Sequence, residues 1–408
     1  MFVAALGLTD FRNYETLDIE LHPGPNLVVG SNGQGKTNLV EALAYLSTLG
    51  SHRVSSDVAL IRQGKDAAIV RARLRHGERQ LLVELQLNRM GANKAQVNRS
   101  AVKTRDLPRS FSSVLFAPED LAIVRGEPSV RRRFMDELLV LRTPRMSGVM
   151  ADYDRVLRQR NTLLKSARNV RSPDLSTLDI WDERLVALGS ELIEARSRLV
   201  TDLGPEVATA YAAIAGADHS ARLHSRLSIM STAVTDDDNE DETATRDGVV
   251  TVDVAAANFR DALTRVRRAE LDRGLTLVGP HRDDLVLDLN GMPARGYASH
   301  GESWSFALSL KLASAQVLRR ESQAGDPVLM LDDVFAELDE SRRERLADAI
   351  ADYEQVLITA AVFGDVPERL AGNVVRIRAG AVVTADSVAE PAPAADAEPT
   401  ADADSAGD

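Results

Sequence analysis

Hydrophobic periodicity divides the chain into two strand-rich ends and a helical middle. Leu17, Ile19 and Leu21 alternate with polar or charged residues, which predicts a half-buried strand. Residues 69–88 carry a similar alternation on both sides of a His-Gly pair and predict a β-hairpin. From about residue 129 to 203 the apolar spacing becomes helical, which predicts packed helices. Apolar runs that suit buried strands return after about residue 275, so the helical region interrupts an α/β core.

These changes in period predict how the chain is organised. We expect a first part of the core at 1–110, an inserted, mainly helical lobe at 111–271 and a second part of the core at 272–386. Within the lobe, residues 231–248 are polar and acidic enough to form a disordered loop. The tail at 387–408 is rich in Ala, Pro, Asp and Glu, cannot bury apolar surface and is expected to be disordered as well.

A glycine-rich loop between an apolar strand and an amphipathic helix is the most informative motif. Its glycines let backbone N–H groups turn around an anion, and the helix adds its positive dipole end. Lys36 would reach the β- and γ-phosphates of ATP, and the Thr37 hydroxyl would coordinate Mg²⁺. A chance glycine turn is the simpler alternative, but the strand and helix that the motif requires are both present. The predicted nucleotide-binding residues here are Gly30, Ser31, Asn32, Gly33, Gln34, Gly35, Lys36 and Thr37.

A second acidic motif follows the apolar run at 328–331. If this run is a buried parallel strand, its carboxyl end delivers Asp332 and Asp333 to the sheet edge where ligands bind. We expect Asp332 to hold Mg²⁺ together with Thr37, and Asp333 to orient or polarise an attacking water. Both are the predicted catalytic residues. Alone, an apolar run that ends in Asp-Asp is weak evidence, but paired with Lys36 it is strong.

A third motif opens a predicted helix at about 303–320. Ser299 and Glu302 have the spacing of a capping box, which would account for them without any further role. With Gly301 they also resemble the signature of ABC-type ATPases, which in that class comes between the glycine loop and the acidic strand, while residues 337–339 resemble the D-loop. The resemblance implies that Ser299, Gly301 and Glu302 complete the nucleotide site of a second subunit.

Three further segments narrow the resemblance to the RecF family. They are 8–14, 116–136 and 279–284, and the order of motifs is similar over roughly residues 1–385. The fold implied is α/β: an ABC-type ATPase head with a mixed sheet and a P-loop, plus the inserted helical lobe. Glu127 departs from the small residue or Asp usual in the family. Asp333 replaces the Glu that transporters usually carry, and its shorter side chain implies slow hydrolysis.

The resemblance also implies a function. It is that of an ATP-dependent DNA-binding protein of recombinational repair and replication restart, active in the SOS response to DNA damage. Such a protein binds gapped DNA at junctions of single-stranded and duplex segments and helps to load the recombinase RecA. ATP and Mg²⁺ are the implied cofactors, with an ATP-dependent homodimer, the partners RecR and RecO, and a weak, DNA-stimulated ATPase used as a switch.

Two rival functions remain open. The nucleotide-binding subunit of an ABC transporter would share all three motifs, but its glycine loop and signature lie much closer together than Lys36 and Ser299 do here. A P-loop kinase or GTPase would lack the signature before the acidic strand. The usual glutamine of the ABC Q-loop cannot be assigned: Pro118, Glu119 and Asp120 occupy the corresponding stretch, and Gln63 and Gln96 are only distant candidates. The role of His281, structural or catalytic, also stays open.

Charge is unevenly distributed along the chain. The net charge of −12 is accounted for by the tail and by the acidic stretch at 236–247. Residues 50–171 instead carry 25 Lys and Arg against 12 Asp and Glu, which favours a polyanion such as DNA. Arg71, Arg73 and Arg75 would share one face of their strand, although a solvated surface explains any one of them equally well.

Composition places the protein in the cytoplasm. The absence of cysteine fits a reducing compartment, and charged residues from Asp10 onward interrupt the apolar N-terminus before it resembles a signal peptide. No apolar run approaches the length of a membrane span.

Overall fold

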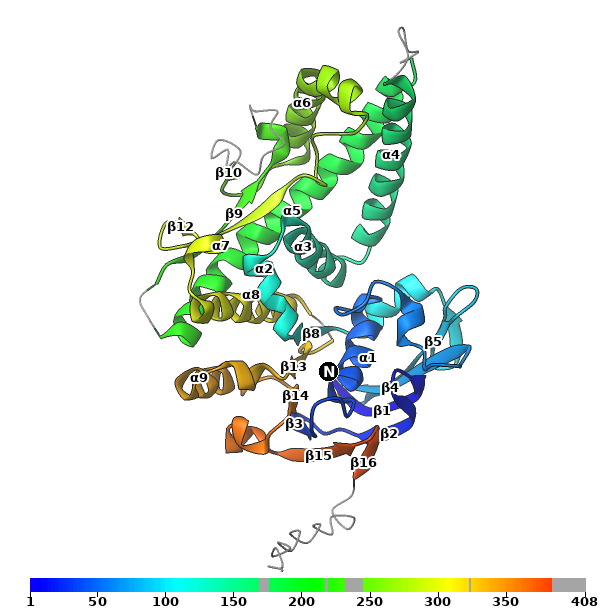
Figure 1. Cartoon of the computed structure of the whole chain (residues 1–408), viewed down its shortest axis with the longest axis vertical. Coiled ribbons are helices and arrows are strands. Elements are labelled where there is room, and N and C mark those ends of the chain that lie inside the picture. Colours follow the sequence, from blue (N-terminus) through cyan, green and yellow to red (C-terminus); the bar gives the residue numbers. More distant parts are fainter. Residues whose placement is uncertain (169–175, 217–218, 232–244, 323, 384–408) are drawn as a thin grey trace, which may run out of the picture.

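The computed structural model describes residues 1–168, 176–216, 219–231, 245–322 and 324–383, which fold into two lobes (Figure 1). A nucleotide lobe contains two six-stranded sheets, helix α1 and helix α9, and a helical lobe contains α2 to α8 with a small four-stranded sheet. The predicted α/β fold with a helical insertion is confirmed. No described helix combines the length and apolar content that crossing a bilayer requires.

A mainly parallel sheet forms the centre of the nucleotide lobe. Its order is β16-β15-β3-β14-β13-β8, and every neighbouring pair except β15 and β16 is parallel. Both faces are covered, which explains why the run at 328–331 is continuously apolar. The strands are β3 Gly24–Val29, β8 Ser113–Phe116, β13 Val328–Asp332, β14 Gln355–Ala360, β15 Asn373–Arg378 and β16 Ala381–Val383.

An antiparallel sheet of order β2-β1-β4-β5-β6-β7 packs over helix α1, Lys36–Thr48. Alternate residues of these strands are buried, so the second face of the sheet is open to solvent. The predicted strand around Ile19 and the predicted hairpin around His76 are both present. The strands are β1 Phe2–Phe11, β2 Tyr14–Glu20, β4 Ala67–His76, β5 Arg79–Asn88, β6 Lys94–Val97 and β7 Ser100–Val102.

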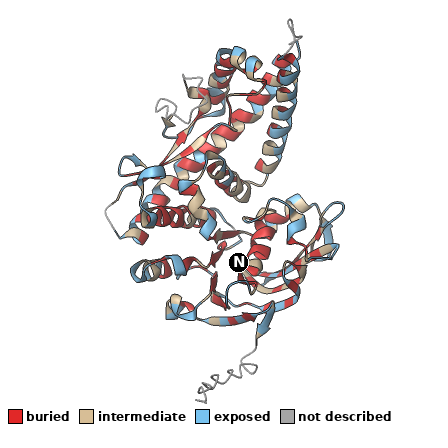
Figure 2. Cartoon of the chain, in the orientation of Figure 1, coloured by how far each residue is buried: buried red, intermediate tan, exposed pale blue. Residues whose placement is uncertain are grey.

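The helical lobe is built around the long helix α5, which packs against α4, α6 and α8. In Figure 2 buried residues follow one another along α5 through the centre of this lobe. The α-helices beyond α1 are α2 Leu121–Arg125, α3 Pro128–Arg142, α4 Met146–Ala167, α5 Leu178–Ala215, α6 Val252–Arg273, α7 Ala294–Tyr297, α8 His300–Glu321 and α9 Glu340–Ile350. The strands of the small sheet are β9 Ala221–Arg226, β10 Thr245–Arg246, β11 Asp284–Leu289 and β12 Met292–Pro293.

The central sheet holds the two lobes together, because its two faces pack against different cores. Leu27, Leu329 and Ile358 face a core that contains α8, whereas Val28, Met330 and Leu357 face α1 and the antiparallel sheet.

Short 3₁₀ turns join several of the helices and strands. They are η1 Asp57–Leu60, η2 Thr104–Ser110, η3 Pro118–Asp120, η4 Ser228–Met230, η6 Val334–Glu337, η7 Phe363–Asp365 and η8 Glu368–Leu370.

Strand pairing differs from the boundaries expected from periodicity. β8 lies after the boundary expected at residue 111, yet it pairs with β13 in the central sheet, and β11 lies after 272, yet it pairs with β9 of the helical lobe. Such pairings join segments far apart in sequence, so local periodicity does not reveal them. At the end of the expected acidic loop, Thr245 and Arg246 pair with β9 instead of forming loop. Residues 232–244 and the tail at 387–408 lie outside the described residues.

Candidate nucleotide site

The glycine loop is held by backbone and side-chain contacts that exclude larger residues. Gly35 has φ +115°, and a Cβ built there would lie 2.8 Å from both Asn13 Nδ2 and the Tyr14 hydroxyl. Those same groups donate to the loop: Tyr14 Oη to the Gly35 carbonyl at 2.9 Å, and Asn13 Nδ2 to the Gln34 carbonyl at 3.1 Å. The β1–β2 turn therefore supports the loop from below, and only glycine fits at position 35.

Lys36 is poised for an anion. It is the first residue of α1 and only 3% exposed, with its Nζ 3.4 Å from Asn32 Oδ1 and 3.8 Å from Asp333 Oδ2. A buried ammonium is costly unless it is paired and hydrogen-bonded, and these two contacts are both long. The phosphates of a nucleotide would supply the missing charge, together with the N–H groups at the start of α1.

Asp332 is brought next to Thr37 although 295 positions separate them. It ends β13, where its Oδ1 accepts hydrogen bonds from Thr37 Oγ1 at 3.1 Å and Thr359 Oγ1 at 2.7 Å. Burial raises the pKa of Asp332 to about 6, against the lowering effect of the two hydroxyls. The two expected Mg²⁺ ligands are thus adjacent. No group of three or more His, Asp or Glu side chains converges among the described residues, so phosphate and water would complete the coordination.

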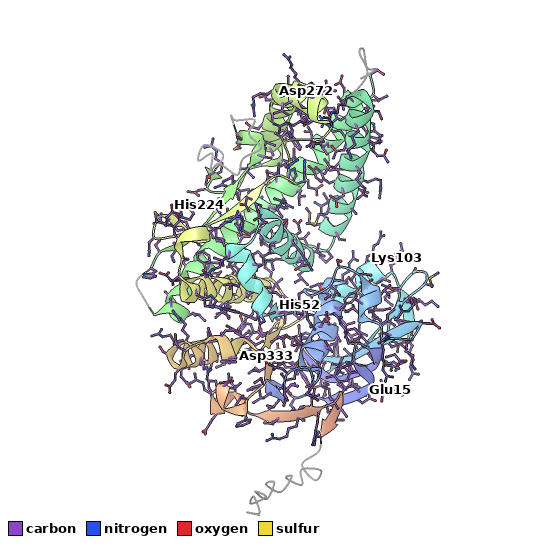
Figure 3. The ribbon with its side chains drawn as sticks, in the orientation of Figure 1. Glu15, His52, Lys103, His224, Asp272 and Asp333 are labelled. Atoms are coloured by element: carbon purple, nitrogen blue, oxygen red, sulfur yellow. The ribbon has the colours of Figure 1, made fainter. Side chains whose placement is uncertain are left out.

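Asp333 has an unusual backbone conformation. Its φ of +52° lies in the left-handed region, and its N–H donates to Thr359 Oγ1 at 2.9 Å. One carboxylate oxygen is within salt-bridge reach of Lys36, and the other, Oδ1, is buried with no hydrogen-bond partner among the described residues. A strained residue with an unsatisfied acceptor suits a group that waits for substrate or water. Figure 3 labels Asp333 in the middle of the nucleotide lobe.

Gly35, Lys36, Thr37 and Asp333 line a pocket of about 300 Å³, whereas Asp332 is outside its lining and is hydrogen-bonded to Thr37. Arg53, which sequence reasoning missed, is also part of its wall; its guanidinium donates to Asn38 Oδ1 at 3.0 Å and lies 3.9 Å from the buried Glu41. A basic residue shortly after the helix that follows the loop was the available signal. The full lining is Asn32, Gly33, Gly35, Lys36, Thr37, Asn38, Arg53 and Asp333. Its charges, 300 Å³ size and glycine cradle fit the triphosphate of ATP.

Three predicted residues of the loop, Gly30, Ser31 and Gln34, do not line this pocket. A Cβ on Gly30 would come within 2.4 Å of the Ile377 carbonyl, so the loop packs directly on β15. The Gln34 side chain accepts from the Ala379 N–H, and its carbonyl accepts from the Gly380 N–H at 3.2 Å. Ser31 is exposed at the turn of the loop. The hairpin around Ala379-Gly380 therefore braces the loop.

The segment after β8 brings Glu119 towards Asp332. Because β8 and β13 are parallel neighbours, their carboxyl ends meet at one edge, and the Glu119 charge is among the causes that raise the pKa of Asp332. Gln63 and Gln96 do not line the nucleotide pocket. An acidic residue therefore stands where the sequence left the Q-loop unassigned.

The signature residues lie apart from this pocket. Ser299 caps α8: its Oγ accepts from the Glu302 N–H at 3.3 Å, and the Ser299 N–H donates to Glu302 Oε2 at 2.7 Å. Gly301 packs against the Arg342 guanidinium, which a Cβ would approach within 2.9 Å. Ser299, Gly301 and Glu302 are absent from the lining of the nucleotide pocket in their own chain. The capping box fully explains their geometry within one copy.

His281 is a packing residue of the helical lobe. Its Nδ1 lies 2.7 Å from the Tyr153 hydroxyl, its Nε2 lies 3.3 Å from the Thr276 carbonyl, and burial lowers its pKa to about 4. The 279–284 segment that it belongs to also holds Arg131, through a two-pronged ion pair with Asp284. These contacts stabilise the lobe and place His281 outside the nucleotide pocket.

Comparison with known proteins agrees with this geometry. The family model described as RecF/RecN/SMC N terminal domain matches residues 2–369. The DNA replication and repair protein RecF of Clavibacter sepedonicus is 62% identical over 412 residues, with 100% of each chain covered.

Two solved structures share the whole fold. One is the recombination mediator protein RecF in the RecFOR pathway, with a TM-score of 0.82 and 27% identity over 93% of this chain and 97% of that one. The second, RecF-ATP of the same pathway, has a TM-score of 0.80 and 27% identity over 94% and 98%. On these matches of sequence and fold, the chain belongs to the RecF family within the RecF/RecN/SMC group.

Proposed function

We propose that the protein is an ATP-dependent DNA-binding protein of DNA replication and recombinational repair that acts as an ATP-gated dimer. Support comes from its relatives, which are DNA replication and repair proteins, and from the RecF-ATP structure that shares its fold. The transporter alternative finds no support, because a RecF relative matches the chain over its full length.

The distance between the phosphate-binding residues and Ser299 supports the proposal that ATP gates a dimer. Lys36 and Thr37 line a pocket whose size and charge suit a triphosphate, and Asp332 is hydrogen-bonded to Thr37. Ser299, at the start of α8, does not line this pocket. A site that needs both parts is completed only by a second copy, related by two-fold symmetry. Where Mg²⁺ is bound, Thr37 and Asp332 would hold it and it would neutralise phosphate charge.

Within each site the chain's own residues have separate tasks. Lys36 and Arg53 bind the phosphates, and Asp333 orients the attacking water with its unsatisfied oxygen. The short carboxylate of Asp333 suits slow, DNA-stimulated hydrolysis that serves as a switch. In the cytoplasm the closed dimer would bind gapped DNA at single-stranded and duplex junctions, help to load RecA with RecR and RecO, and contribute to replication restart and the SOS response.

A mixing experiment tests the composite site. Lys36→Met should abolish ATP binding, and Ser299→Arg should leave ATP binding intact but block closure of the dimer. Each variant alone should be inactive as an ATPase. In an equal mixture, heterodimers carry one intact site, so about a quarter of the wild-type rate should return. Crosslinking with ATP measures heterodimer formation independently. If Ser299→Arg alone hydrolyses ATP at the wild-type rate, Ser299 is only a helix cap.

A titration tests DNA binding. We expect binding of gapped DNA that requires ATP and weakens steeply with salt, because each neutralised phosphate releases about one counterion. Binding that responds to neither ATP nor salt would contradict the proposed function.

A further inference from the structure

Much of the positive surplus at 50–171 is neutralised in the folded chain. Arg131 pairs with Asp284, and Arg160 with Asp182 and Glu270, all from outside the segment. Even Arg71, one of the three arginines expected on the sheet face, pairs with Glu84 of the next strand. The bases of the segment that form ion pairs are Arg53, Arg62, Lys65, Arg71, Arg109, Arg131, Arg133, Arg142, Arg145, Arg155 and Arg160.

The bases without a carboxylate partner are concentrated on one structure. Eight exposed cations from β4 to η2 form no ion pair within the described part of the chain, and we call them the β4–β7 basic surface. Figure 3 labels one of them, Lys103, at the margin of the nucleotide lobe. The eight are Arg73, Arg75, Arg79, Arg89, Lys94, Arg99, Lys103 and Arg105.

Strand register places these cations beside one another. Arg73 and Arg75 are on the solvent side of β4, and Arg73 pairs with Leu82 of β5. Leu82 in turn exchanges hydrogen bonds with Asn98, next to Arg99, so the two arginines flank a single residue of β5. Strands lie about 4.8 Å apart and alternate residues about 7 Å apart, so the cations are spread over a broad surface of several strands. Of the exposed acids on this sheet, Glu15, Asp18 and Glu20 are on β2 at the far edge, and Glu78 is at the β4–β5 turn.

The shape and chemistry of this surface favour duplex DNA. Unpaired cations in close array repel one another and attract a polyanion. Single-stranded binding proteins add exposed aromatic side chains on which bases stack, but the exposed large hydrophobic residues among the described positions include no aromatic on β4 to β7. Phosphates of a duplex require only charge and a broad surface.

We propose that the β4–β7 basic surface holds the phosphate backbone of the duplex arm of the DNA substrate. The inference rests on the proposed DNA-binding function and assigns it a face of the nucleotide lobe. The competing location is the end of α4 in the helical lobe, where Arg158, Lys165 and Arg168 are also exposed and without ion pairs among the described residues.

Matched triple variants of the full chain distinguish the two locations. One replaces Arg73, Arg75 and Arg99 by Ala, and the control replaces Arg158, Lys165 and Arg168 by Ala, so both lose the same charge. With ATP present, the first should bind a blunt duplex about ten-fold more weakly or worse, and the slope of log affinity against log salt should fall by about three. The control should bind like the wild type. Replacing the three arginines by Lys should preserve binding.

Further readouts separate the possible failures. ATP binding and the melting temperature should be unchanged in the Ala variant, and binding of a thymine oligonucleotide should weaken much less than binding of the duplex. Equal losses for single-stranded and duplex DNA would overturn the duplex assignment. A loss confined to the control variant would move the site to α4. A wild-type protein that binds no DNA with ATP would instead refute the proposed function.

Discussion

The nucleotide pocket and the signature end of α8 differ in how they are completed. In the pocket, Thr37 and Asp332 come from opposite ends of the chain and are hydrogen-bonded at 3.1 Å. At the signature, Ser299 and Glu302 satisfy each other over three positions. The nucleotide pocket is assembled by the tertiary fold and contains buried charges without close partners. At the signature, the hydrogen bonds are all made between neighbouring residues of one helix end. The contrast teaches that buried charges without close partners mark a ligand site, whereas a helix cap is satisfied by its own residues.

The electrostatics of the two regions differ in the same way. Burial raises the pKa of Asp332 to about 6, so its ionised form is destabilised in the folded chain, and a bound cation would stabilise it. Hydrogen bonds from Ser299 lower the pKa of Glu302, so its charge is already stabilised. A ligand is therefore expected to reorganise the first region more than the second.

The largest effect is expected when a single methyl group is added to the glycine loop. Gly35→Ala forces a left-handed φ on alanine and places its Cβ against Asn13 and Tyr14. A strain of about 3 kcal/mol should weaken ATP binding roughly a hundred-fold. Isothermal titration would measure it. Gly33→Ala is the control, because φ there is also positive but no atom lies within 4 Å of the new Cβ. Equal losses in both variants would show that contact with Asn13 and Tyr14 is unimportant.

A smaller effect, on the rate of ATP hydrolysis, is expected from removing the Thr359 hydroxyl that contacts both Asp332 and Asp333. Thr359→Val removes the hydroxyl that donates to Asp332 and accepts from the Asp333 N–H. Loss of a hydrogen bond to a charged group, about 1.5 kcal/mol, should lower kcat about ten-fold while ATP affinity changes less. Steady-state kinetics beside equilibrium binding would separate the two quantities. Thr359→Ser should recover most of the rate, and failure of that recovery would point to packing instead.

A substitution of Arg342 tests the role proposed for the signature residues at the start of α8. Its guanidinium donates to Asp339 Oδ2 at 2.8 Å and packs on Gly301, so it joins the D-loop to the signature within one chain. Arg342→Ala should slow dimer-dependent hydrolysis about five-fold through misplaced signature residues, with no change in ATP binding by the monomer. Analytical ultracentrifugation with ATP and an ATPase assay would measure both. A loss of monomer ATP binding would contradict the separation of the two regions.

His281 should affect neither region but should change stability with pH. Its pKa is about 4 in the folded chain and near 6.5 when unfolded, so its contribution is complete above pH 6.5 and disappears as pH falls towards 4. The destabilisation caused by His281→Gln should therefore be larger at pH 7.5 than at pH 5, by up to about 2 kcal/mol. Urea unfolding at both pH values measures it. The raised pKa of Asp283, about 6, acts alike in both proteins and largely cancels in the comparison. An unchanged difference would mean that His281 titrates normally.

The sequence by itself determined the parts whose signals are local. The glycine loop, the buried strand before Asp332, the hairpin around His76 and the cap at Ser299 each depend on residues within a few positions. Glycine conformation, strand alternation and capping operate over that range, so pattern was sufficient. The alternatives for Ser299 stayed open because a cap and a signature use the same residues.

Only the tertiary structure decided what depends on distant neighbours. It placed Arg53 in the pocket wall, brought Glu119 towards Asp332 through the pairing of β8 with β13, and gave Asp333 its left-handed backbone. It also separated paired from unpaired charge. Net charge along a sequence cannot show that Arg160 is neutralised by Glu270 while Arg73 forms no ion pair with any described residue, because an ion pair is set by distance in space.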